Sequence, residues 1–165
     1  MSEKCYNAGM DLDIEQIVRE YIDASLHMSL ATAIDGKPWV SEVHFVYDDN
    51  LNLYWRSRAS RRHSQEIVVN PNVAGNIVRQ HALDEYPHAV YFEGKAVRIE
   101  DDQERSDVFL LFKKRLGTNE SVLDEAKDDS GHQFYKITVE NWYAFGKFGK
   151  PTGQKYQLRW NGGDV

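Results

Sequence analysis

"MSLATAIDGKPWVSEVHFVYDDNLNLYWRS", residues 28–57, predicts three short strands joined by two tight turns. Asp35-Gly36 is typical of a two-residue hairpin, and Asp48-Asp49-Asn50 marks the second turn. Parallel neighbours would need long crossover connections, usually helical, for which these turns leave no room. The stretch therefore favours an antiparallel sheet over a doubly wound parallel fold.

The rest of the chain adds strands and a few helices. Apolar residues three or four apart predict a helix over residues 11–26, with Asp11 or Asp13 as its cap. Residues 101–117 predict another helix, with acids in the first turn, basic residues in the last and Gly117 past its end. Further strands are expected at residues 72–78, 88–100, 133–148 and 155–160. This pattern favours a mainly β fold, a small barrel with peripheral helices.

Length and composition bound the class of protein. A chain of 165 residues favours one domain over residues 1–165, with mobile tails at 1–10 and 161–165. Lys+Arg 20 against Asp+Glu 26 leaves no basic surplus, so we expect no nucleic-acid partner. The single Cys5 excludes an intrachain disulfide and fits a reducing cytoplasm. No apolar run approaches membrane-spanning length and no secretory leader precedes Asp11, so we expect a cytoplasmic protein without a membrane partner.

Residues 60–71, SRRHSQEIVVNP, place two arginines and a histidine at the start of a short helix, with Ser60 as a possible N-cap. A helix start already carries partial positive charge, so cations there repel it unless an anion lies between them. Backbone N–H groups, hydroxyls and guanidinium groups together suit a phosphate. The alternative is that these cations are solvated or pair with acids such as Glu66, Asp48 or Asp49.

The other histidines give weaker signals. His44 lies in mid-strand on the face opposite Val43 and Phe45, where a solvent-facing role is favoured over a catalytic one. His81 and His88 flank an acidic loop, but their spacing matches no ligand motif, so we expect no metal site. No Ser/His/Asp or Cys/His arrangement predicts a nucleophile, and no catalytic residue is assigned.

The stretch from Ser29 to Ser57, continued by "RHSQEIVVNPNVAGNI" (62–77) and "YFEGKAVRI" (91–99), resembles the pyridoxamine-5'-phosphate-oxidase-like, FMN-binding split-barrel superfamily. A course "xATxxxDGxPxxxxVxFxYDDxxLYxxSxxxxRHxxNIxxNPxVA" is typical of that family. The resemblance implies a six-stranded antiparallel split β-barrel. It also implies a homodimer that binds FMN in two clefts along the interface.

The resemblance further implies which residues hold the FMN phosphate. Arg62 and His63 match the family's phosphate-holding pair, and Ser57 matches the strand-end hydroxyl that joins them. Arg61 stands where a small hydroxylated residue is usual, so either it adds a second guanidinium or the register of the match slips by one residue.

Residues beside the flavin ring are implied in the same way. Ser41, Glu42 and Val43 match the strand whose backbone runs beside the isoalloxazine ring. Trp142 matches an aromatic residue contributed by the partner subunit. Trp55 is added as a second aromatic near the cleft, because flat aromatic surface suits a flavin edge. The remaining tryptophans are expected in the core.

These implications predict an FMN-dependent oxidoreductase acting on a small-molecule substrate, in which the flavin carries the chemistry. True pyridoxamine-phosphate oxidases carry an Arg and a Lys on the strand that here reads "SEVHFVYD", and this pair is absent, so that substrate is not expected. One alternative is a flavin carrier or redox sensor without turnover. Another is F420 or haem in place of FMN, with His63 or His132 as a candidate axial haem ligand.

Overall fold

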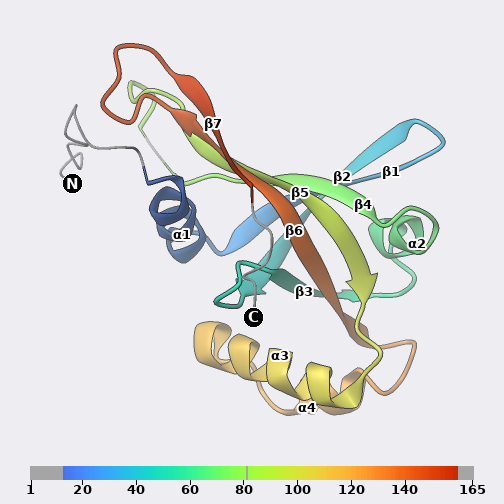
Figure 1. Ribbon diagram of the computed structural model, residues 1–165. Helices are drawn as coiled ribbons and strands as arrows, with labels where there is room; N and C mark the ends of the chain where they lie inside the picture. Colours follow the sequence, from blue (N-terminus) through green and yellow to red (C-terminus); the bar gives the residue numbers. More distant parts are fainter. Residues whose placement is uncertain (1–12, 81, 160–165) are drawn as a thin grey trace.

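A computed structural model describes residues 13–80 and 82–159. Seven strands form one antiparallel sheet: β1 (His27–Ile34), β2 (Lys37–Tyr47), β3 (Leu53–Arg58), β4 (Asn72–Ile77), β5 (Ala89–Arg98), β6 (His132–Gly146) and β7 (Gln154–Arg159). Their order is β3-β2-β1-β4-β5-β6-β7, and an additional β3–β6 pairing closes the first six into a barrel. The predicted six-stranded antiparallel barrel is confirmed, and β7 extends it beyond β6 (Figure 1).

The hairpin that decides the fold forms as the sequence predicts. β1 pairs with β2 from His27 opposite His44 to Ile34 opposite Lys37. The turn between them has positive φ at both Asp35 (51°) and Gly36 (72°), the combination that matches the twist of the flanking strands. The last part of β2 then turns back to pair with β3.

Residues 13–80 and 82–159 contain four helices: α1 (Ile14–Ala24), α2 (Arg62–Val69), α3 (Asp102–Leu116) and α4 (Ser121–Glu125). The first precedes β1, α2 lies between β3 and β4, and α3 and α4 lie between β5 and β6. Asp13 caps α1 by accepting the N–H of Gln16 at 3.0 Å, as expected for one of the two candidate caps. Gly117 ends α3 in the left-handed conformation (φ 66°), also as expected. The short helix α4 was not predicted.

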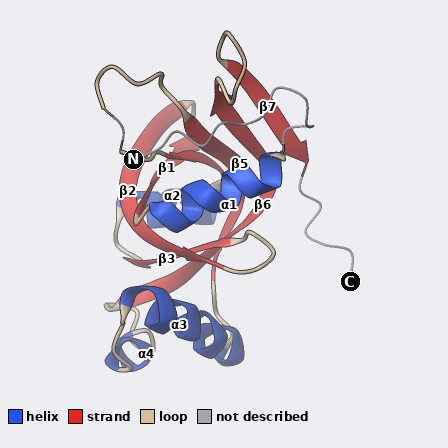
Figure 2. Ribbon diagram, turned by 90° about the vertical axis from the view of Figure 1, so that its left-hand side faces the viewer, coloured by secondary structure: helices blue, strands red, loops and turns tan. Residues whose placement is uncertain are grey.

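Two apolar cores support the fold. The larger fills the barrel, and α1 packs against it through Ile17, Val18, Tyr21 and Ile22. The smaller lies between the outer face of the barrel and α3–α4, and contains Phe109, Phe112 and Phe134, among others. Figure 2 shows α3 and α4 together at the end of the molecule away from α1.

Some sequence predictions lie outside the described residues. They concern the two tails, Cys5, His81 and Trp160. Among the helices that the structure describes, none has the length and apolar character needed to cross a bilayer.

Candidate functional site

The start of α2 is the centre of the predicted anion site. The N-cap is Arg61, in an extended conformation (φ −72°, ψ 147°), and it makes no side-chain capping bond. Ser60 as the N-cap was wrong, because the N–H of Arg61 bonds the carbonyl of Arg58 at 3.0 Å and places Ser60 inside a turn. The first helical bond runs from Gln65 N–H to the Arg61 carbonyl. The N–H groups of the first turn therefore lack a cap from the residues that the structure describes.

His63 joins α2 to two strands of the barrel. Its Nε2 lies 2.8 Å from Oγ of Ser57 on β3, and its Nδ1 lies 3.0 Å from Oγ of Ser41 on β2. Burial lowers the pKa of His63, and the nearby charge of Arg61 lowers it further. The imidazole is therefore neutral at neutral pH, and it orients the two hydroxyls rather than adding a cation.

Arg62 is held in place by a buried acid. Its Nε donates to Oε1 of Glu66 at 2.7 Å, and Thr32 on β1 donates to the other carboxylate oxygen at 2.5 Å. The Thr32 bond first, and then the Arg62 bond, lower the pKa of Glu66. The Arg62 guanidinium also lies 4.4 Å from the ring centre of Trp39, whose Nε1 donates to Ser41. Because the bond to Glu66 uses Nε, it leaves both Nη nitrogens of Arg62 for a ligand, while Glu66 and Trp39 hold the guanidinium group in position.

The alternative was that the cations at the start of α2 pair with acids such as Glu66, Asp48 or Asp49, and only the pairing with Glu66 is observed among the described residues. Glu66 pairs with Arg62, but it is buried and belongs to the site. Asp48 instead accepts bonds from Asn52 and Tyr54 in its own turn.

A groove of about 650 Å³ lies on the outer face of the barrel, between β2–β3 and the α3–α4 segment. Glu42 and Val43, two of the residues expected beside the flavin ring, line it. His44 lines it as well and is solvent-exposed, as favoured from the sequence; its ring centre lies 4.1 Å from that of His27. Leu26, Phe112 and Leu116 are among its apolar walls.

Glu125 organises the polar end of this groove. One carboxylate oxygen accepts from Nδ1 of His132 at 2.5 Å, and the other accepts from Arg56 at 2.6 Å. The His132 bond is the main reason that the pKa of Glu125 falls to about 2, and the bond and charge of Arg56 also contribute. Because Glu125 engages Nδ1, Nε2 of His132 remains for a ligand in the groove.

The predicted site residues therefore divide into two groups and two exceptions. Ser41, Ser57 and His63 meet in one hydrogen-bonded set, with Arg61 and Arg62 beside it. Glu42 and Val43 lie along the groove.

The two tryptophans expected at the cleft are corrections. Trp55 and Trp142 are each 0% exposed in the barrel core. Trp55 stacks on Tyr135 with ring centres 5.0 Å apart, and Trp142 meets Phe92 edge-on at 5.6 Å. Buried rings cannot contact a cofactor in a cleft, nor can Trp142 reach the cleft of a partner subunit.

Several site residues were missed from the sequence. The aromatic residue that does lie at the site is Trp39, which is 42% exposed. It stands two residues before Ser41, so strand alternation places both on one face and offers a signal that could have found it. Thr32 and Glu125 carry no comparable local signal, because their partners are distant in sequence.

A closed six-stranded antiparallel barrel, with a basic helix start beside a Ser-His-Ser set, defines a split-barrel protein of the pyridoxamine-5'-phosphate-oxidase-like type. The model of the pyridoxamine 5'-phosphate oxidase family matches residues 14–146. The chain belongs to this family, as its resemblance implied.

Similar proteins support the fold. The UPF0306 protein plu4501 of Photorhabdus laumondii is 25% identical over 91 residues, 54% of this chain and 64% of that protein. The chain thus spans less than two thirds of that relative. A haem-binding protein from Mycobacterium smegmatis has a TM-score of 0.71 at 17% identity, over 89% of this chain and 59% of that one. Campylobacter jejuni ChuZ has a TM-score of 0.74 at 17% identity, over 94% and 63% of the two chains. At such identities the structural likeness shows the fold alone.

Proposed function

We propose that this chain binds FMN and serves as a flavin-dependent oxidoreductase for a small-molecule substrate. The observation that carries the proposal is the start of α2, where no side chain caps the first turn and the two arginines, Arg61 and Arg62, are exposed. Such a helix end attracts an anion, and two guanidinium groups match the oxygens of a phosphate. The residues present therefore fit a phosphate-bearing cofactor.

The roles of the surrounding residues follow from their contacts. Arg62 would hold the phosphate through its Nη nitrogens, while Glu66 and Trp39 fix its direction. His63 would keep the Ser57 and Ser41 hydroxyls in place. The groove beside Glu42 and Val43 would take the ring, and bound flavin would supply hydride transfer. A homodimer with the cofactor at its interface is part of the proposal.

FMN binding tests this function. The visible spectrum of the purified protein is recorded before and after FMN is added, and affinity is measured by quenching of flavin fluorescence. We expect Arg62→Ala to weaken binding about 10- to 100-fold, because charge-assisted bonds to the phosphate are lost. Lys114→Ala removes an exposed cation of α3 far from α2 in sequence and serves as the control, with unchanged affinity.

Two outcomes contradict the proposal: FMN that does not bind, or an Arg62→Ala protein that binds as tightly as wild type. If FMN binds, oxidation of NADH or NADPH by the loaded protein separates an oxidoreductase from a carrier or sensor. A negligible rate with both donors favours the carrier.

A second candidate function is haem binding, and the geometry of His132 favours it. The related fold of the Mycobacterium smegmatis haem-binding protein directs attention to the histidines. His63 has both ring nitrogens engaged by serines, whereas His132 offers Nε2 with Nδ1 bonded to Glu125. Histidines that bind metals commonly pair their other nitrogen with a carboxylate in this way.

Haem titration of three proteins tests this candidate. We expect wild type and His63→Ala to give the same sharp Soret band, and His132→Ala to lose it, because His132, unlike His63, lines the groove and has its other ring nitrogen bonded to a carboxylate. The oligomeric state of each variant, measured by light scattering, checks that the assembly is unchanged. An unaltered Soret band in His132→Ala would exclude this residue as the axial ligand.

A further inference from the structure

A chain of hydrogen bonds runs from Trp39 on β2 to the end of β3 and passes through His63 on α2. Nε1 of Trp39 donates to Oγ of Ser41 at 3.0 Å, and the same Oγ lies 3.0 Å from Nδ1 of His63. Nε2 of His63 lies 2.8 Å from Oγ of Ser57. These side chains are therefore linked in one line, in which each bonds to the next.

The donors and acceptors of this chain restrict where its hydrogens lie. The Trp39 indole nitrogen is a donor only, so Oγ of Ser41 accepts its hydrogen. His63 is neutral at neutral pH, because burial and the charge of Arg61 lower its pKa. One of its ring nitrogens therefore donates while the other accepts. Two arrangements satisfy these conditions, and they differ in which nitrogen of His63 carries the hydrogen.

The two arrangements differ in the direction of the bonds. In the first, Ser41 donates to Nδ1 of His63, Nε2 donates to Ser57, and the Ser57 hydroxyl keeps its hydrogen for another acceptor. In the second, Ser41 accepts from both Trp39 and His63, and the Ser57 hydrogen is used on Nε2. Hydrogen bonds aligned head to tail polarise and strengthen one another, whereas two donors aimed at one oxygen repel. The indole N–H of Trp39 therefore favours the first arrangement.

The first arrangement leaves the Ser57 hydrogen for a ligand at the start of α2. Ser57 is 5% exposed, and within residues 13–80 and 82–159 its side chain bonds only to His63. His63 is the second residue of α2, whose first turn has no side-chain cap. A buried hydroxyl hydrogen without an acceptor is costly, and phosphate oxygens are strong acceptors. The hydrogen of Ser57 thus matches the anion expected there.

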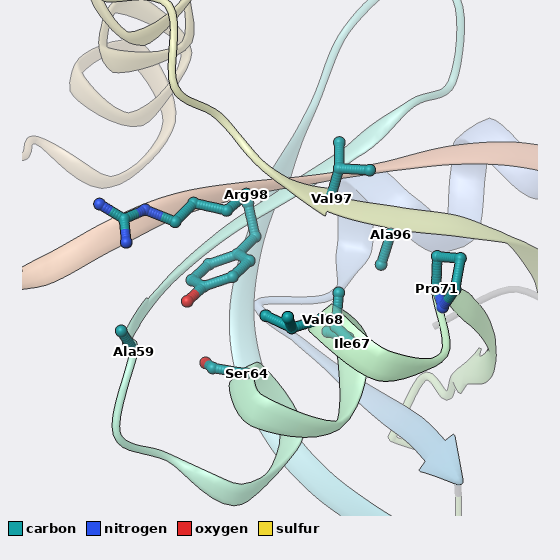
Figure 3. A pocket seen from close by; sticks show the side chains of 9 residues that line it. Ala59, Ser64, Ile67, Val68, Pro71, Ala96, Val97 and Arg98 are labelled. Carbon is teal, nitrogen blue, oxygen red and sulfur yellow. The ribbon is translucent and has the colours of Figure 1, made fainter. Parts of the chain in front are cut away.

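The side of α2 that faces β5 does not belong to this hydrogen-bond chain. Ser64, Ile67 and Val68 line a hollow between α2 and β5 (Figure 3). Ser64 is 1% exposed, and its hydroxyl interacts with the phenol of Tyr135. Ser64 follows His63 directly in the sequence, so this second buried hydroxyl of the same region offers a matched control.

We propose that Trp39 is a positioning residue, which sets His63 to the Nε2–H tautomer and so directs the Ser57 hydrogen to a bound phosphate. This role belongs to the indole N–H and is distinct from the contact of the Trp39 ring with Arg62. The part that concerns the phosphate deepens the proposed FMN function and rests on it. The tautomer is a property of the free protein and does not depend on FMN.

Long-range ¹H–¹⁵N correlation spectra of the free full-length protein test the tautomer, at alkaline pH where imidazoles are neutral. We expect His63 to carry its hydrogen on Nε2. His132, whose Nδ1 donates to Glu125, should carry it on Nδ1 and serves as the internal reference. Trp39→Phe keeps an aromatic ring beside Arg62 and removes the N–H. In this variant His63 should become a mixture of both tautomers, while His132 is unchanged.

A double-mutant cycle tests the consequence for the ligand. Trp39→Phe should weaken FMN about 2- to 10-fold, and Ser57→Ala should weaken it at least as much, since each affects the same hydrogen bond. Because Trp39 acts through Ser57, the double variant should bind FMN as Ser57→Ala does, without a further loss. Ser64→Ala should keep both the wild-type affinity and the wild-type tautomer.

Three results overturn the proposal. The first is a wild-type His63 with its hydrogen on Nδ1, and the second is a tautomer that Trp39→Phe leaves unchanged. The third is a double variant in which the two losses of FMN affinity add, because Trp39 then acts independently of Ser57. If wild type does not bind FMN but the tautomer responds as expected, the flavin function fails and the role of Trp39 in setting the tautomer is supported.

Discussion

Replacement of Trp142 by alanine is expected to destabilise the protein by about 3–5 kcal/mol. Its side chain is 0% exposed and packs edge-on against Phe92 in the main core. The barrel is closed by the β3–β6 pairing, so the strands cannot collapse into the space left behind. Unfolding in guanidinium chloride, followed by far-ultraviolet circular dichroism, gives the free energy without relying on tryptophan fluorescence.

Trp39→Ala is the matched control for Trp142→Ala. Trp39 is 42% exposed, and it loses only its contact with Arg62 and its bond to Ser41. We expect a cost of about 1 kcal/mol or less for this exposed cation–π pair. Equal losses in the two variants would contradict the assignment of Trp142 to the core. FMN affinity should be reduced in Trp39→Ala, because Arg62 loses a contact. It should be unchanged in Trp142→Phe, a milder replacement that keeps an aromatic ring in the core.

The place of Trp142 in the core has a specific physical cause. Ile137 and Val139 point into the barrel, so strict alternation would send residue 142 outward. The register of β5 and β6 shifts between Glu93 and Gly94, which lie opposite Asn141 and Val139. Glu140 is the extra residue, and the phase of alternation changes after it. Sequence alternation alone cannot locate such a shift, because the partner strand sets it.

The fold was otherwise accessible from local signals. The Asp35-Gly36 turn fixed the first hairpin, and residues near the predicted strand ends supplied Ser57 and His63. Distant contacts were not accessible. Thr32 meets Glu66 across 34 positions and Arg56 meets Glu125 across 69, so neither pair leaves a pattern within one segment. The basic helix start was therefore predicted, whereas the position of the groove and the role of Glu125 at its polar end appeared only in the structure.

Gly94→Ala is expected to cost about 3 kcal/mol or more, since it forces a side chain into packed backbone at the register shift. A Cβ on Gly94 would lie 2.2 Å from the carbonyl oxygen of Thr138 and 3.0 Å from Cα of Val139. Both contacts are with backbone, so no side chain can rotate away. Relief requires β5 to separate from β6 where Trp142 enters the core. The free energy of unfolding and the near-ultraviolet circular dichroism of the tryptophans measure the effect.

Comparison of Gly36→Ala with Gly94→Ala separates two causes of lost stability, an unfavourable backbone conformation and a lack of space for the side chain. Gly36 has φ +72°, and no atom lies within 4 Å of the place that a Cβ would occupy, so alanine there costs only the left-handed conformation, about 1–2 kcal/mol. Gly94 does not have a left-handed φ, so its cost comes from space alone. We expect Gly94→Ala to lose more stability and to change the tryptophan signal, while Gly36→Ala leaves that signal intact. If Gly94→Ala cost no more than Gly36→Ala, the strands could adjust freely at the bulge, and the bulge would not be what fixes Trp142 in the core.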